Sequence, residues 1–147
     1  MEFKTKDCGF SIDAPTNWKY KKQQGVDSYV GEIYIGNKDT IHFDLGYFSN
    51  SLDYSFCTRE LDIDDELVKT KKSFETINGL NAKFVLHRYK NLNDFGIHFD
   101  SLWTDKHSEQ FESRDIVRFT VYGKNISKTG QKQMKQVFRT IKFFKFY

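Results

Sequence analysis

Residues 128–142, KTGQKQMKQVFRTIK, decide the fold class predicted for this chain. Apolar residues recur there at helical spacing and gather on one face of the expected helix: Met134, Val137, Phe138 and Ile141. Ser127 precedes the stretch, and a serine in this position accepts a hydrogen bond from the first free N–H groups of a helix. The sequence therefore predicts an amphipathic helix over 128–142 that covers another layer with its apolar face.

The chain before this helix has the alternation of half-buried strands. Between 40 and 48, the apolar side chains share one face, whereas His42 and Asp44 lie on the other. Asn78-Gly79 is the residue pair that type I′ hairpin turns prefer. We expect strands around Phe10 and Ile12 and over 28–35, 40–48, 68–76, 80–89, 96–104 and 115–122, with the lysine-rich 68–76 at a sheet edge. Strands in succession followed by one helix predict an α+β fold, in which the C-terminal amphipathic helix packs on an antiparallel sheet.

The composition is that of one folded domain over residues 1–147. Hydrophobic residues make up 38% of the chain and aromatic residues 17%, so a few large side chains can fill the core. No apolar run reaches the roughly 18 residues of a membrane span. Residues 1–7 carry no signal peptide, although an exported chain whose signal had been removed would look the same. Cys8 and Cys57 do not decide the compartment; free thiols are favoured, and a disulfide between them stays open.

Two short motifs at the ends of the chain resemble those of PsbP-like domains. The first is Gly-Phe-x-Ile-x-x-Pro-x-x-Trp at residues 9–18, and the second is Phe-Arg-Thr-Ile-Lys-Phe at 138–143. Residues 25–33 also resemble small bacterial proteins of the same fold. This superfamily includes the extrinsic protein of photosystem II and a Ran-binding nuclear import factor. The resemblance implies a curved antiparallel sheet sandwiched by helices in an α/β/α-like arrangement, and non-enzymatic binding roles without a shared active site.

The tetrapeptide Ile-His-Phe-Asp occurs twice, at 41–44 and at 97–100. Because residues two apart in a strand share a face, each copy presents an imidazole beside a carboxylate. If the two strands were neighbours, these groups could bind a metal ion, which gives a small metal-dependent hydrolase as an alternative function. Its site would be His42, Asp44, His98 and Asp100. The simpler interpretation, which we favour, is that both strands turn isoleucine and phenylalanine inward and the polar pair outward; we expect no metal and no cofactor.

Other catalytic patterns are missing from the sequence. Gly-x-Ser-x-Gly and the Gly-rich phosphate-binding loops do not occur. The acidic residues of 60–66 lack the glycine and the final glutamate of an EF-hand loop, so we expect a solvated loop there. The sequence therefore favours a protein without catalytic activity.

Positive charge is concentrated near the C-terminus. No acidic residue follows Asp115, whereas eight lysines and arginines do. On the expected helix, Lys132, Lys135 and Arg139 belong to one basic stripe beside the apolar face. A nucleic-acid-binding module that uses this stripe is a second alternative function, and an acidic protein is another possible partner. A solvated helix face, or pairing with the acids of 60–66, explains the same pattern without a partner, and we consider nucleic acid the less favoured choice.

The leading interpretation is a non-catalytic binding or scaffold domain for a protein or a cell-envelope component. We expect the concave sheet face and the 49–66 connection to line the site, because long loops in compact domains are often functional. The candidate contact residues are Trp18, Asp27, Glu32 and Tyr47. Each of them also has a purely structural interpretation. The ligand, the native compartment and the oligomeric state do not follow from the sequence.

Overall fold

A computed structural model describes residues 1–25, 28–36, 38–53, 64–104 and 116–146. In these residues, seven strands form a large sheet in which every neighbouring pair is antiparallel. The strands are β3 (Lys19–Lys22), β4 (Tyr29–Ile35), β5 (Asp39–Gly46), β6 (Lys69–Ile77), β7 (Leu80–Tyr89), β8 (Leu92–Thr104) and β9 (Ile116–Gly123). Their spatial order is β3-β4-β5-β9-β8-β7-β6, which confirms the antiparallel sheet and the edge position of the lysine-rich strand.

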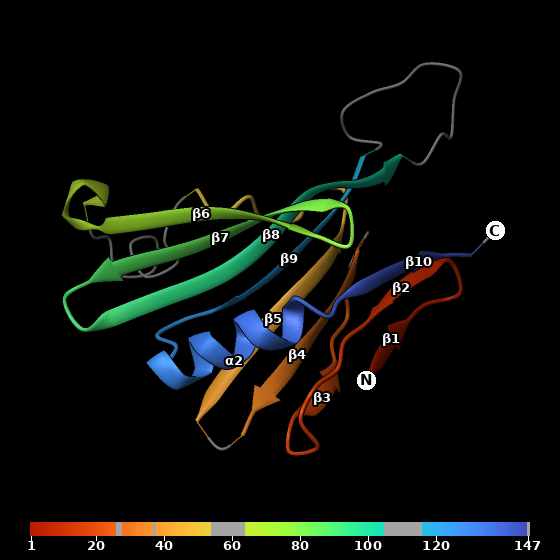
Figure 1. Ribbon diagram of the computed structural model, residues 1–147, viewed down its shortest axis with the longest axis horizontal. Helices are drawn as coiled ribbons and strands as arrows, with labels where there is room; N and C mark the ends of the chain where they lie inside the picture. The colour runs from red at the N-terminus through yellow and green to blue at the C-terminus, as the bar shows by residue number, and fades with distance from the viewer. Residues whose placement is uncertain (26–27, 37, 54–63, 105–115, 147) are drawn as a thin grey trace.

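A second layer lies on one face of the large sheet. It consists of helix α2 (Lys128–Phe138) and a small antiparallel sheet in the order β1-β2-β10, formed by β1 (Glu2–Lys4), β2 (Cys8–Ser11) and β10 (Lys142–Lys145). Figure 1 shows α2 running into β10 along this face. A short 3₁₀ helix, η1 (Asp65–Leu67), precedes β6. The coarse α+β prediction is confirmed, and no helix in the described ranges is long and apolar enough to cross a membrane.

The helix is shorter than the sequence predicted. It ends at Phe138, and the N–H groups of Thr140 and Ile141 bond to carbonyl groups three residues earlier, which tightens the last turn. Residues 142–145 then pair with β2 and form a strand. An aromatic run suits a pleated surface better than a helix. Ile141 still contributes to the core, with 1% of its surface exposed, but from outside the helix.

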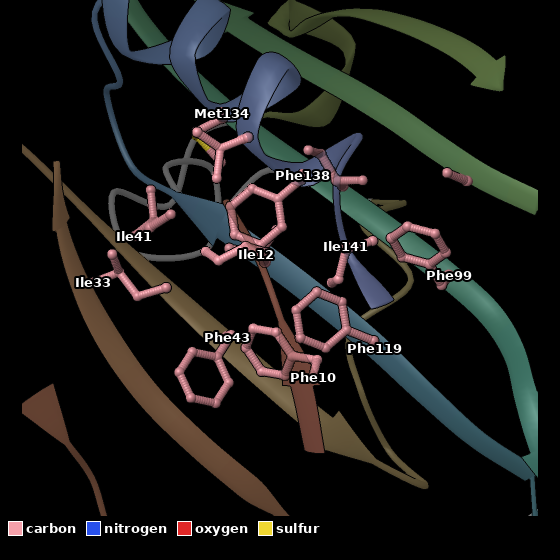
Figure 2. Packing of buried hydrophobic residues seen from close by; sticks show 14 of the residues in the cluster. Phe10, Ile12, Ile33, Ile41, Phe43, Phe99, Phe119, Met134, Phe138 and Ile141 are labelled. Atoms are coloured by element: carbon pink, nitrogen blue, oxygen red, sulfur yellow. The ribbon is translucent and has the colours of Figure 1, made fainter. Parts of the chain in front are cut away.

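The core between the two layers is rich in aromatic rings. Figure 2 shows Met134 and Phe138 of α2 pointing toward the large sheet, above Phe119 of β9. From the small sheet, Phe10 meets Phe43 and Phe119 edge-on, with ring centroids 5.0 and 4.8 Å apart. Such rings bury large apolar areas, so the high aromatic content compensates for the modest share of hydrophobic residues.

A buried carboxylate fixes the start of α2. The side chain of Asp39 on β5 accepts a hydrogen bond from the Ser127 hydroxyl at 2.6 Å and another from the Ser127 N–H at 3.2 Å. The Ser127 hydroxyl oxygen in turn accepts from the N–H of Gly130 at 3.0 Å, which confirms Ser127 as the N-cap. Asp39 is only 9% exposed and stands where a negative charge complements the helix dipole. The helix is therefore tied to the sheet at its N-terminus.

Candidate functional site

A cleft of about 720 Å³ opens at one end of the core, between the large sheet and the small sheet. We call it the end cleft. The large sheet and the chain beside it contribute Tyr29, Leu45, Tyr47, Trp103 and Val117. The opposite wall comes from residues 5–7, which join β1 to β2, from Cys8 at the start of β2 and from the end of β10, and residues 22–25 complete the rim. A cavity of this size is in the range that accommodates small molecules.

The lining combines aromatic rings with ammonium groups. Trp103 and Phe146 face the cavity together with two tyrosines, and Leu45 and Val117 form an apolar floor. Three lysines and one acidic residue line the cleft: Lys6, Lys22, Lys145 and Asp7. The cavity can therefore hold an apolar body and, near its rim, a negatively charged group.

Tyr29 lines the cleft, and its hydroxyl group is hydrogen-bonded to a second tyrosine. Its oxygen lies 2.9 Å from the hydroxyl oxygen of Tyr20 on β3. Burial, followed by the hydrogen bond with Tyr20, raises the pKa of Tyr29 well above its ordinary value. The phenol stays protonated at physiological pH and can act as a hydrogen-bond donor or acceptor.

Of the four candidate contact residues, the structure places one in the end cleft. Tyr47 lines it, and its backbone carbonyl accepts a hydrogen bond from Arg118 at 2.9 Å. Trp18 is 2% exposed and packs against Phe138 in the core, where its indole N–H finds no partner among the described residues. Glu32 is on the opposite face of the sheet and accepts a hydrogen bond from the Tyr34 hydroxyl, which lowers the pKa of the Glu32 carboxyl. Asp27 lies outside the described residues, as does Cys57.

The structure does not bring the two His-x-Asp pairs together. His42 and Asp44 are on β5, His98 and Asp100 are on β8, and β9 pairs with both strands and separates them. His42 stacks on Tyr122 of β9 and lies 3.7 Å from Glu32. In the described ranges, no group of three or more histidine, cysteine, aspartate or glutamate side chains is placed to hold a metal ion.

His98 is instead part of the attachment of residues 49–53, which we call the strap. The strap crosses the face of the large sheet that is remote from α2. The Thr120 hydroxyl donates to the Asn50 carbonyl at 2.6 Å, and a carbonyl can only accept. The same hydroxyl lies 2.6 Å from Nδ1 of His98. Because its only proton goes to Asn50, the imidazole N–H donates and the Thr120 oxygen accepts in this second bond.

A second buried histidine, His87, holds the strap at Leu52. Nε2 of His87 lies 2.8 Å from the Leu52 carbonyl and donates to it, while Nδ1 faces the Thr70 hydroxyl at 2.8 Å. The Leu52 side chain is 3% exposed, and the cavity left beside it on Gly96 is only about 10 Å³. The strap therefore packs tightly on β7, β8 and β9 and leaves little room for a ligand there.

The basic stripe does not act as one surface. Arg139, just after α2, binds Glu75 of β6 through two hydrogen bonds of 2.6 and 2.9 Å. This contact lowers the pKa of Glu75. Lys135 lies over the Phe95 ring at 5.6 Å from its centroid, while Lys132 is exposed. Of the acidic segment 60–66, which we considered as a partner of the stripe, residues 60–63 lie outside the described residues.

Sequence reasoning did not identify Lys6, Lys22 or Trp103 of the end cleft. These residues come from three distant parts of the chain, the β1–β2 connection, β3 and β8, and only the packing of the two sheets places them around one cavity. No family model, curated protein or solved structure matches the chain. Any function must therefore be argued from the residues themselves.

Proposed function

We propose that the protein is a non-catalytic binding domain whose end cleft holds an amphipathic anion. The observation that carries the proposal is the cleft itself, about 720 Å³ with aromatic walls and lysines at its rim. Of the two partner classes expected from the sequence, a cell-envelope component fits a cleft of this volume better than a protein does, because protein surfaces meet over flatter and larger areas.

The pairing of an apolar body with a negative group follows from the lining. The rings of Tyr47 and Trp103 offer wide apolar surfaces, and aromatic side chains bind ligands without losing much conformational entropy. Lys6 and Lys22 are exposed, so their ammonium groups can meet an anionic group at the mouth. Phosphate, sulfonate and carboxylate amphiphiles share this chemistry.

A binding role is favoured over the metal-dependent hydrolase because the residues that the hydrolase needs are otherwise engaged. His98 donates its Nδ1 proton to Thr120 and is 2% exposed. His42 lies two strands away. For the nucleic-acid alternative, the pairing of Arg139 with Glu75 removes one of the three cations that it would use.

We also infer that the chain is a PsbP-like domain with a curved, sandwich-like sheet. In support of this, the two end motifs contact each other. Trp18 packs against Phe138, with ring centroids 6.4 Å apart, and the N–H of Asp13 donates to the Thr140 hydroxyl at 2.8 Å. An experimental structure that paired these segments with other parts of the chain would overturn this inference.

The binding proposal is tested with an aryl sulfonate, 1-anilinonaphthalene-8-sulfonate, whose fluorescence rises in apolar surroundings. We expect saturable binding to the folded protein and energy transfer from tryptophan, which Trp103→Phe reduces to the part contributed by Trp18 in the core. Lys22→Glu should weaken binding about threefold to tenfold, since one exposed ion pair contributes up to about 1 kcal/mol and reversal replaces attraction with repulsion.

Lys90→Glu is the matched control, because Lys90 is exposed at the turn between β7 and β8 and does not line the cleft. It should bind the probe as the parent protein does. Two results would refute the anionic class of ligand. One is equal weakening of sulfonate binding in Lys22→Glu and in Lys90→Glu. The other is that Lys22→Glu binds the sulfonate as the parent does, and also binds the uncharged analogue N-phenyl-1-naphthylamine as the parent does. The cleft is refuted as a binding site if the folded protein shows no saturable binding of the sulfonate at temperatures below its unfolding transition.

A further inference from the structure

A second hollow, of about 360 Å³, lies between α2 and the outer strands of the large sheet. We call it the α2–β6 groove. One wall is α2, through Gln131 and Lys135, and the other is β6, through residues 71–73. Its floor consists of Phe84, Leu86 and Phe95 from β7 and β8. It is separate from the end cleft, with which it shares no lining residue.

The groove is positively charged. Lys71, Lys72 and Lys135 line it, and none of its lining residues is acidic. Lys72 lies 3.7 Å from Asp53 of the strap, but no carboxylate within the described ranges forms an ion pair with Lys71 or Lys135. The nearby Glu75 is already bound by Arg139 through both of its carboxylate oxygens. Lys71 therefore has no carboxylate partner among the described residues, and Lys135 shares the charge of Glu75 with Arg139.

The floor is apolar and covered by two cationic side chains, of which Arg139 is held by Glu75 and Lys135 forms no such hydrogen-bonded pair among the described residues. The Lys135 ammonium lies over the ring of Phe95, and the Arg139 guanidinium lies over the ring of Phe84 at 5.8 Å. Leu86 is only partly buried. A lysine arm over a ring can move aside at small cost, because such contacts contribute about 0.5–1 kcal/mol at exposed sites. The groove can then admit one apolar side chain.

The wall formed by β6 also offers main-chain groups. Among the described strands β6 is the last in the sheet order, so the outer row of its backbone N–H and C=O groups has no strand partner there. It spans nine residues from Lys69 to Ile77, which is long for an edge strand. An extended segment beside it could form backbone hydrogen bonds while its side chains enter the groove.

We propose that the α2–β6 groove docks an extended acidic segment of a partner protein, with carboxylates on Lys71 and Lys135 and one apolar side chain on the floor. A volume of about 360 Å³ suits a side-chain anchor and is small for a cofactor. Nucleic acid is the less suitable occupant, because a phosphate backbone makes no use of an apolar floor and Arg139 is held by Glu75.

The test uses a fluorescein-labelled nine-residue peptide that alternates glutamate with leucine, and measures fluorescence anisotropy. We expect saturable binding that falls about tenfold in Lys71→Gln and in Lys135→Gln, which corresponds to about 1.4 kcal/mol each. Lys128→Gln is the matched control, since Lys128 is exposed on the first turn of α2 and does not line the groove. A peptide with lysine for glutamate, and one with alanine for leucine, should both lose binding.

Three results would overturn the proposal: no binding of the glutamate–leucine peptide at millimolar protein, equal binding by Lys128→Gln and both groove variants, or groove-dependent binding of a single-stranded oligonucleotide. Urea unfolding of each variant verifies that the fold is intact. Binding of the aryl sulfonate in the end cleft should not change in the groove variants, so failure of this inference is distinguishable from failure of the proposed function.

Discussion

Replacement of Asp39 by alanine should destabilise the protein, because it removes the contact that ties the start of α2 to the sheet. Asp39 is 9% exposed, and its carboxylate accepts both the hydroxyl and the N–H of Ser127. Gly130 lies so close that a Cβ there would stand 2.3 Å from the Asp39 carboxylate. The alanine variant leaves the hydroxyl and the N–H of Ser127, at the helix terminus, without this partly buried acceptor.

The magnitude follows from these contacts. A hydrogen bond to a charged group contributes about 1.5–3 kcal/mol to stability. The attraction between a carboxylate and a helix N-terminus adds about 0.3–1 kcal/mol. We expect Asp39→Ala to lower the free energy of unfolding by about 3 kcal/mol, and Ser127→Ala to lower it by about 2 kcal/mol, since an N-cap serine alone contributes about 1 kcal/mol. Because both changes remove the same bond, the double variant should lose about 1–2 kcal/mol less than the sum.

Urea unfolding followed by circular dichroism measures all four free energies. Asp13→Ala is the matched control: Asp13 is exposed, and the hydrogen bond at this residue uses its backbone N–H, so the change should stay within about 0.5 kcal/mol. The reasoning is refuted if Asp39→Ala lowers the free energy of unfolding by less than about 1 kcal/mol, which is below the contribution of one hydrogen bond to a charged group. It is also refuted if the effects of Asp39→Ala and Ser127→Ala are additive within about 0.3 kcal/mol.

Three further predictions concern the opposite sheet face and the edge. Gly96→Ala places a Cβ 2.6 Å from Leu52 of the strap and should lower the free energy of unfolding in urea by about 1–3 kcal/mol; an unchanged value would show that the strap is loosely packed. Burial lowers the pKa of His98 and of His42 in the folded protein, so below about pH 6.5 the unfolded state binds protons that the folded state does not. The free energy of unfolding should therefore fall from pH 7 to about pH 5, and His98→Gln should make the fall shallower; a flat profile in the parent contradicts this. Phe74 on β6 is 73% exposed, so Phe74→Thr should change stability by less than about 0.5 kcal/mol, and a larger loss in thermal unfolding would place that ring in a contact.

The sequence predicted best where a few neighbouring residues decide the structure. The β7 range was predicted to its end residues, and the Asn78-Gly79 turn has the positive φ values, 49° and 80°, that its residue types suggested. β3 was missed, because all four of its side chains are exposed and no alternation marks it. The end of α2 was misplaced, because Ile141 continues the helical spacing of apolar residues although Lys142 already pairs with Ser11.

The candidate site was harder to predict, because its parts are brought together only by long-range pairing. Tyr47 was identified as a candidate on the apolar face of the predicted strand 40–48, whereas Lys6 and Lys145 sit at opposite ends of the chain and line the same cavity. Their proximity follows from the registration of β10 on β2, in which Lys145 pairs with Cys8. No periodicity within either segment encodes that register, so composition and spacing could indicate a binding protein but not this cleft.

The repeated Ile-His-Phe-Asp shows why a correct face assignment does not give a role. Alternation placed His98 on the face away from α2, and the structure agrees, but the strap then covers it to 2% exposure. Its role follows from two consecutive hydrogen bonds. The Thr120 hydroxyl donates its proton to the Asn50 carbonyl, so its oxygen must accept the proton on Nδ1 of His98. In the neutral ring, Nε2 has no proton to donate to Asp100, 3.4 Å away, and Arg118 pairs with that carboxylate at 3.3 Å. The second copy of the motif that suggested a metal site therefore has a structural role, because its histidine helps to hold residues 49–53 on the sheet. A metal site and this structural role could have been distinguished only by knowing where the strap lies.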